Sequence, residues 1–163
     1  MSRHIFPTTI GACAIAWDDR DERLTSFSLP NLDLRASDNS SERPPWICDL
    51  AVRVQLHLAG TPQDFSDATY AFARVTEFQR DVYLQTLAVK SGSTRSYGEL
   101  AAALALPPGG SRAVAAALGA NPWPLLIPCH RIIGATGKMT GFSGPGGIAT
   151  KTQLLALEGA RLL

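Results

Sequence analysis

The chain has 163 residues, of which 45% are hydrophobic, enough to bury the cores of one large domain or two small ones. Its apolar runs are too short to span a membrane, and residues 1–12 lack the basic start and apolar core of a signal peptide. The net charge is only +1, but residues 1–70 carry six basic against ten acidic residues, whereas residues 71–163 carry nine against four. A basic C-terminal half suits a polyanionic partner, and we expect two domains, 1–70 and 71–163.

The N-terminal half predicts a β-hairpin followed by a less certain segment. Residues 10–17 (IGACAIAW) are apolar and small, as in a buried strand, and residues 24–29 alternate as a return strand after a charged turn. Residues 36–45 are polar and end in proline, which is typical of an exposed loop. The pattern of residues 46–58 fits either a strand or a short helix followed by a strand, and this choice stays open.

The three cysteines, Cys13, Cys48 and Cys129, are odd in number and widely spaced. This arrangement argues against a disulfide framework and favours a reducing, cytoplasmic setting. Together with His4 and His57, the first two match no compact zinc spacing. We therefore expect no metal site.

The C-terminal half carries the stronger helix signals. Residues 77–89 place apolar side chains on one face behind Thr76, which suits an N-cap. Residues 97–106 favour a second helix, and a Pro-Pro-Gly-Gly turn then precedes Ser111, which we expect to cap a helix over 112–118. Two short helices joined by a tight turn suit a DNA-binding helix-turn-helix, although an αα-hairpin in any small helical domain has the same pattern.

Residues 121–143 are the most informative stretch, because Cys129-His130-Arg131 follows an apolar run there. An imidazole and a guanidinium beside a thiol favour the thiolate, and a thiolate with an adjacent base is a candidate nucleophile. Glycines in the following segment let it fold closely around the sulfur. The alternative is a small core cysteine that precedes a histidine by chance. A last helix over 149–158 could carry Glu158 inward.

Motifs spread over residues 76–160 share an order and spacing with a known family. They are Phe-Gln-x-x-Val at 78–82, Ser-Tyr-Gly-Glu-Leu-Ala at 96–101, Arg-Ala-Val at 112–114, Asn-Pro-x-Pro at 121–124, Pro-Cys-His-Arg at 128–131, and Lys151 with Glu158. In these motifs the chain resembles the O6-alkylguanine-DNA alkyltransferases. The resemblance implies a ribonuclease-H-like α/β N-terminal domain and a mainly α, winged helix-turn-helix-like C-terminal domain. It also implies DNA repair by irreversible, stoichiometric transfer of an alkyl group from O6-alkylguanine, or from O4-alkylthymine, to the protein's own cysteine without a cofactor.

By this resemblance, Cys129 is the alkyl acceptor, His130 removes its proton through a water, and Glu158 orients the imidazole in a Cys-His-acid triad. Asn121 braces the site. Tyr97 helps to turn the nucleotide out of the helix and protonates the departing guanine.

The resemblance further implies a monomer that binds double-stranded DNA from the minor groove, with the damaged base flipped out. Arg112 fills the gap that the base leaves in the stack, and Arg131 supports the structure. The remaining candidates contact phosphates (Gln79, Ser111) or line the guanine pocket (Pro124, Ile132 through its carbonyl, Phe142, Ser143). The loop between Ser143 and Lys151 is longer than the commoner form, and Phe142 stands where tyrosine is frequent, so the range of alkyl groups stays open.

Two other functions fit part of the pattern. A lesion-binding or regulatory DNA-binding protein would share the helices without transferring the alkyl group. A Cys-His hydrolase would turn over repeatedly and would need an oxyanion hole. The presence of Cys129 and the length of the resemblance favour the alkyltransferase.

Overall fold

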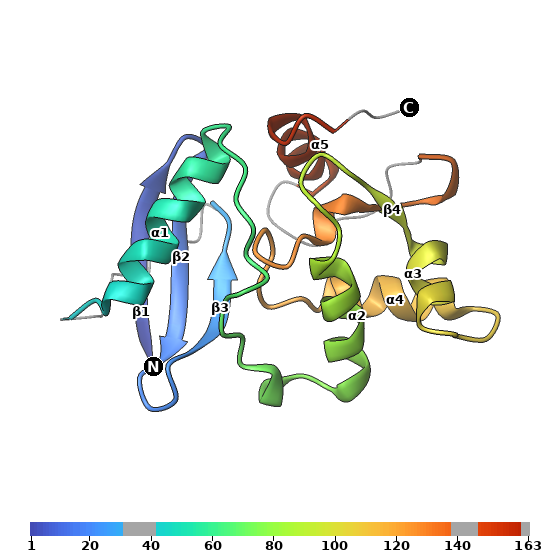
Figure 1. The fold of residues 1–163 in the computed structure, drawn as a ribbon, viewed down its shortest axis with the longest axis horizontal. Helices are drawn as coiled ribbons and strands as arrows, with labels where there is room; N and C mark the ends of the chain where they lie inside the picture. Colours follow the sequence, from blue (N-terminus) through green and yellow to red (C-terminus); the bar gives the residue numbers. More distant parts are fainter. Residues whose placement is uncertain (31–41, 138–146, 161–163) are drawn as a thin grey trace.

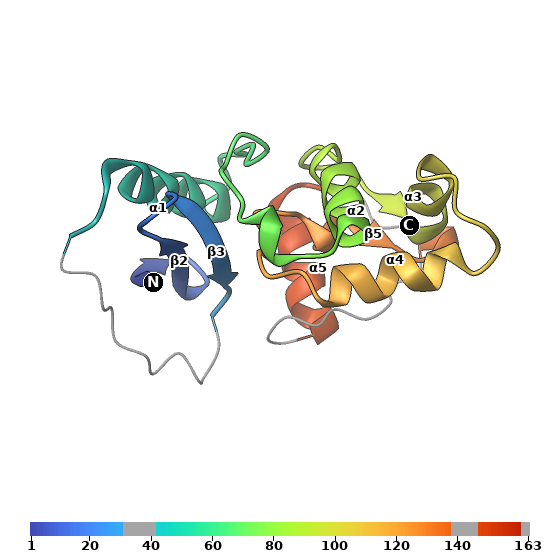
Figure 2. The same ribbon diagram turned by 90° about the horizontal axis from the view of Figure 1, so that it is seen from below.

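The computed structural model of the chain describes residues 1–30, 42–137 and 147–160. A three-stranded sheet with one helix forms one side of the molecule, and the remaining helices form the other side in both views (Figures 1 and 2). Within the described part of the chain, the helices are all too short or too polar to cross a membrane.

The sheet is antiparallel, with the order β1 (Ser2–Thr8), β2 (Gly11–Asp18) and β3 (Arg23–Ser28). The predicted hairpin of β2 and β3 is confirmed. Strand β1 was not predicted, because its sequence shows no clean alternation of apolar and polar residues, and Phe6 is its one buried residue. Pairing of Phe6 with Cys13 sets its register on β2.

The segment left open between strand and helix is a single helix, α1 (Pro45–Leu58). Proline at its first position leaves no unsatisfied backbone N–H there. The buried side chains recur at helical spacing, which is the face that packs on the sheet: Ile47, Leu50, Ala51, Val54, His57 and Leu58. Much of the loop expected over 36–45 lies outside the described residues.

Capping boxes start the first two long helices of the C-terminal half. After the short η1 (Phe72–Arg74), Thr76 caps α2 (Glu77–Leu87) with Gln79 closing the box. Ser96 and Glu99 do the same for α3, Tyr97–Ala103. The predicted cap at Thr76 is therefore confirmed.

Two predictions around the next turn are wrong. Helix α3 ends at Ala103 rather than at residue 106, because Ala105 has φ of 54°, a left-handed conformation that turns the chain out of the helix. Helix α4 (Gly110–Gly119) begins before Ser111, so that residue lies inside the first turn and does not cap it.

Glycines set the start of α4. Gly109 is the N-cap with φ of 90°, a left-handed conformation that side chains other than glycine rarely adopt. A Cβ on Gly110 would lie 2.6 Å from the Cβ of Leu106. The turn between α3 and α4 is thus tight because both positions are glycine.

The two sides of the molecule are joined through the segment that precedes Cys129. The indole Nε1 of Trp123 donates to the carbonyl of Leu24 at 3.0 Å, and the backbone N–H of Phe27 donates to the carbonyl of Pro122 at 2.9 Å. The Trp123 ring is fully buried and packs edge-on against Tyr70 at 5.3 Å. These contacts attach the segment that leads to Cys129 to strand β3.

A small parallel pairing links the cysteine turn to α3. The short η2 (Cys129–Arg131) leads into β5 (Ile132–Ile133), which pairs with β4 (Arg95–Ser96). After η3 (Ala135–Gly137), the last helix is α5 (Gly147–Leu157). Helix α5 starts two residues earlier than predicted and ends just before Glu158.

Candidate active site

The turn before Cys129 is held by the side chain of Asn121. Its Nδ2 donates to the carbonyl of Ile127 at 3.0 Å, and its Oδ1 accepts from the backbone N–H of Trp123 at 2.9 Å. Leu125, inside this turn, has φ of 77°, an uncommon and strained conformation for a branched residue. Asn121 thus connects both ends of the turn that leads into Cys129.

Cys129 lies at the start of η2 and is 7% exposed. Burial raises the pKa of its thiol, and this effect outweighs the lowering by a hydrogen bond from Asn121 and by the charge of Lys151. The sequence predicted a thiolate stabilised by its neighbours. The structure differs first because the thiol is buried, and the charge of Arg131 is directed to another partner.

That partner is Glu158, which also binds His130. Arg131 donates from Nε to Oε1 of Glu158 at 2.9 Å and from a terminal nitrogen to Oε2 at 2.6 Å. The Nε2 of His130 lies 2.9 Å from the same Oε1, and its side chain is fully buried. A third guanidinium nitrogen of Arg131 donates to the carbonyl of Val89 at 2.7 Å, so Arg131 has the supporting role that was expected.

The charge state of Glu158 decides which nitrogen of His130 carries a proton. Burial alone would raise the pKa of Glu158, but hydrogen bonds from His130, His57 and Arg131 hold it well below its usual range. An ionised carboxylate only accepts, so His130 donates from Nε2. Burial lowers the pKa of His130, and its Nδ1 is buried without a hydrogen-bond partner among the described residues. Nδ1 is therefore the free basic nitrogen of a neutral ring.

Tyr97 stands at the start of α3 beside a buried lysine. The Nζ of Lys151 is 3.3 Å from the Tyr97 hydroxyl and donates to the carbonyl of Ile132 at 2.6 Å. The pairing of β4 with β5 brings Tyr97 next to the residues that follow η2. Contacts through Lys151 and Asn121 thus connect Tyr97 to the surroundings of Cys129.

The predicted DNA-contacting residues lie on α2 and α4. Arg112 and Ser111 are exposed at the start of α4. Gln79 is half-buried and uses its side-chain oxygen to accept from the backbone N–H of Thr76. Of the predicted pocket residues, Pro124 is half-buried, Ile132 is buried, and Phe142 and Ser143 lie outside the described residues.

Two residues of the candidate site were not assigned roles from the sequence. Lys151 is fully buried on α5 at helical spacing with buried Leu154 and Leu155. His57 likewise continues the apolar face of α1 and binds Glu158 at 2.8 Å. A polar side chain on an otherwise apolar helix stripe was the available signal in both cases.

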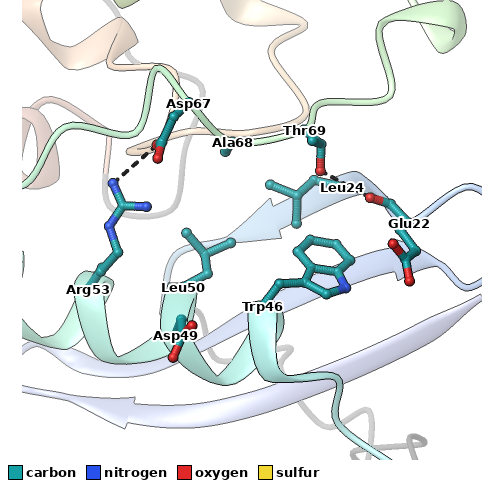
Figure 3. A pocket seen from close by; sticks show the side chains of 9 residues that line it. All are labelled: Glu22, Leu24, Trp46, Asp49, Leu50, Arg53, Asp67, Ala68 and Thr69. Atoms are coloured by element: carbon teal, nitrogen blue, oxygen red, sulfur yellow. Dashed lines mark hydrogen bonds and ion pairs between the residues drawn. The ribbon is translucent and has the colours of Figure 1, made fainter.

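A separate hollow of about 410 Å³ lies in the N-terminal half between α1, β3 and residues 67–69 (Figure 3). Its wall includes Trp46 and the ion pair of Arg53 with Asp67 at 3.2 Å. None of the predicted site residues lines it. Across the described residues, the histidine, cysteine and acidic side chains form no group of three that could hold a metal ion.

A buried thiol, followed in sequence by a neutral histidine that a carboxylate orients, defines a protein with cysteine-centred group transfer or hydrolysis. Known proteins decide between these classes. The family model for the DNA-binding domain of 6-O-methylguanine DNA methyltransferase matches residues 77–160.

Relatives match over almost the whole chain. The methylated-DNA–protein-cysteine methyltransferase of Methanosarcina acetivorans is 33% identical over 156 residues, which are 96% of this chain and 97% of that protein. The protein of the same name from Mycolicibacterium paratuberculosis is 49% identical over 140 residues, 85% of this chain and 82% of that protein. The crystal structure of Mycobacterium tuberculosis OGT in complex with DNA has a TM-score of 0.79 at 33% identity and covers 98% of this chain and 93% of that one.

The chain therefore belongs to the methylated-DNA–protein-cysteine methyltransferase family. Its activity is that of the family, DNA repair by methyl transfer to a cysteine. A Cys-His hydrolase is not favoured.

Proposed function

We propose that Cys129 is the acceptor of the alkyl group and that His130 is the base that removes the thiol proton through a water. The observation that carries this proposal is that the buried Nδ1 of His130 has no hydrogen-bond partner among the residues that the structure describes. The other ring nitrogen, Nε2, is hydrogen-bonded to Glu158 at 2.9 Å. A proton taken from Cys129 can therefore bind only at Nδ1. The carboxylate then stabilises the imidazolium that forms.

The reaction is a displacement at the alkyl carbon. The sulfur of Cys129 forms the new bond to carbon, the bond from carbon to guanine O6 breaks, and its electron pair stays on guanine. Tyr97 donates a proton to the departing base, and Lys151, 3.3 Å from the phenol oxygen, stabilises the phenolate left behind. The product is a thioether, which water does not hydrolyse, so each molecule reacts once.

A raised thiol pKa fits this sequence of steps. A neutral, buried thiol is a poor nucleophile toward other electrophiles. It becomes reactive when His130 accepts its proton in the presence of a bound lesion. Asn121 lowers the pKa of Cys129 through its hydrogen bond and so assists that ionisation.

The DNA enters along α4. Arg112 is exposed at its start, and the neighbouring Ala113, Ala115 and Ala116 are exposed small residues that allow close approach. We propose that this helix lies in the minor groove, that Arg112 fills the stack behind a flipped base, and that Ser111 and Gln79 contact phosphates. The solved complex of M. tuberculosis OGT with DNA supports DNA binding by this fold.

We also propose the domain folds, the oligomeric state, the cellular setting and the substrates. They are a ribonuclease-H-like N-terminal domain over 1–70, a winged helix-turn-helix-like domain over 71–163, a monomeric state and a cytoplasmic setting. Pro124, Ile132, Phe142 and Ser143 line the guanine pocket. The substrates are O6-alkylguanine and O4-alkylthymine in double-stranded DNA.

Peptide mass analysis tests the acceptor. After incubation with duplex DNA containing O6-methylguanine, the peptide with Cys129 gains one methyl group, and Cys129→Ala gains none. The exposed Cys48 is an internal control, because a freely accessible thiol without the base should stay unmodified. Methylation of Cys48 instead would overturn the proposal, and tight lesion binding with no added mass would indicate the lesion-binding alternative.

A further inference from the structure

The carboxylate of Glu158 is shared between the two sides of the molecule. Its Oε1 accepts from His130, whereas its Oε2 lies 2.8 Å from the Nε2 of His57 on α1. Both side chains of the second pair are 2% exposed. The N-terminal half therefore contacts the proposed triad directly, although it contributes no reacting group.

The hydrogen bonds of His57 define its protonation state. The backbone N–H of Gln63 donates to Nδ1 of His57 at 3.0 Å. A backbone amide can only donate, so Nδ1 must carry a lone pair and the ring proton must be on Nε2. In this arrangement His57 donates from Nε2 to Glu158.

The ring of His57 is held in this orientation by its surroundings. It is 3% exposed in the last turn of α1, and the ring of Phe65 packs edge-on against it at 5.6 Å. The backbone N–H of Gly60 donates to the carbonyl of His57 at 3.1 Å, which closes the helix end beneath the ring. A side chain with these constraints can fix the position of the group that it binds.

We propose that His57 is a positioning residue for alkyl transfer, which holds Oε2 of Glu158 so that Oε1 points at His130. This inference rests on the proposed roles of His130 and Glu158. Arg131 contacts both carboxylate oxygens and fixes the plane of the group. His57 supplies the second donor to Oε2, so the carboxylate is fully bonded without water, and the orientation of His130 depends on docking of the N-terminal domain.

Two polar variants separate the two hydrogen bonds of His57. The amide nitrogen of Gln in His57→Gln reaches the position of Nε2 and can donate to Glu158. The shorter side chain in His57→Asn reaches only the position of Nδ1, so it keeps the contact with Gln63 and leaves Oε2 without its donor. Both variants place an amide in the same buried site, which makes each the control for the other.

The measurement is the single-turnover rate of methyl transfer from O6-methylguanine duplex DNA, together with affinity for the same duplex carrying guanine. We expect His57→Gln to react close to the wild-type rate and His57→Asn to react about tenfold more slowly, as for lost outer hydrogen-bond partners of histidine ligands. DNA affinity should be equal in all three proteins. The NMR chemical shift of the Nε2 proton of His130 should change in His57→Asn and should equal the wild-type value in His57→Gln.

Equal transfer rates in the two variants would overturn the inference, as would a loss in His57→Asn that appears only in DNA affinity. Glu158→Gln distinguishes this outcome from failure of the proposed triad. If Glu158→Gln slows transfer and His57→Asn does not, only the role of His57 fails. If Glu158→Gln reacts at the wild-type rate, the role proposed for Glu158 fails and that of His57 with it.

Discussion

The Nε2 of His130 lies 2.9 Å from Oε1 of Glu158, and neither side chain is more than 2% exposed. This contact joins the histidine that follows Cys129 to an acid directly after helix α5. Because the second nitrogen of His130 is buried and unpartnered in the described structure, the contact also determines which nitrogen can take up a proton.

Replacing Glu158 by Gln should destabilise the protein and slow methyl transfer. The change leaves the buried guanidinium of Arg131 without its counter-charge, a loss of about 3 kcal/mol in the free energy of unfolding. Urea denaturation and the single-turnover rate measure the two effects. Glu77→Gln, at an exposed glutamate in the first turn of α2, is the matched control and should change stability by less than about 0.5 kcal/mol. Equal stability of the two variants would contradict the buried ion pair.

The carboxylate of Glu158 should make the stability of the wild type more sensitive to acid than that of Glu158→Gln. Because the pKa of Glu158 is depressed in the folded chain, its contribution to stability is present above the ordinary value of 4.5 and is lost as the pH falls below it. Because the unfolded chain takes up this proton first, the free energy of unfolding falls by about 1.4 kcal/mol per pH unit. Denaturation curves should be recorded from about pH 5 downward, where carboxylates become protonated. The free energy of unfolding should fall more steeply with decreasing pH for wild type than for Glu158→Gln. Parallel curves would exclude the depressed pKa.

Cys129 should be a neutral thiol in the free protein at neutral pH. Burial raises the pKa of this thiol from its ordinary value of 9.0. Thiolate ultraviolet absorbance, taken as the difference between wild type and Cys129→Ala, should therefore emerge only above that value. Cys13 is a second buried thiol, and burial raises its pKa to about 12. Because it is present in both proteins, its absorbance cancels in the difference. A difference signal already complete at neutral pH would show that the thiol is ionised before DNA binds.

Arg112→Ala should weaken repair of duplex DNA far more than reaction with free O6-benzylguanine. The exposed side chain at the start of α4 contacts neither Cys129 nor Glu158 in the described structure, so its removal leaves the chemistry intact. Loss of the group that fills the stack should slow duplex repair about tenfold or more, since unstacking costs a few kcal/mol. Similar losses on both substrates would argue against the stack-filling role.

The sequence predicted those parts of the fold that depend on local signals. The hairpin of β2 and β3 follows from alternation and a charged turn, and the start of α2 follows from the Thr76 cap. The start of α4 was placed wrongly because Ser111 is a good capping residue by type, whereas Gly109 is required by its φ of 90° and Gly110 by the contact with Leu106. That contact is not visible in a local pattern.

The candidate site was predictable where a short motif carries it and not where distant segments meet. Cys129 and His130 are adjacent in sequence, and the family motifs pointed to Glu158. The contact of His57 with Glu158 joins residues 101 positions apart, and nothing local distinguishes a buried histidine that binds an acid from one that only fills the core. The direction of the Cys129 pKa shift was not predictable locally, because the sequence shows that His130 and Arg131 are adjacent but not how deeply the thiol is buried or that Arg131 is paired with Glu158.

The most direct test of the account is the mass of the intact protein after incubation with an excess of duplex DNA containing O6-methylguanine. The account predicts that wild type gains a single methyl group on Cys129 and then stops reacting, however much lesion remains, whereas Cys129→Ala gains none. Continued removal of methyl groups by protein that keeps its original mass would contradict a stoichiometric acceptor at this cysteine.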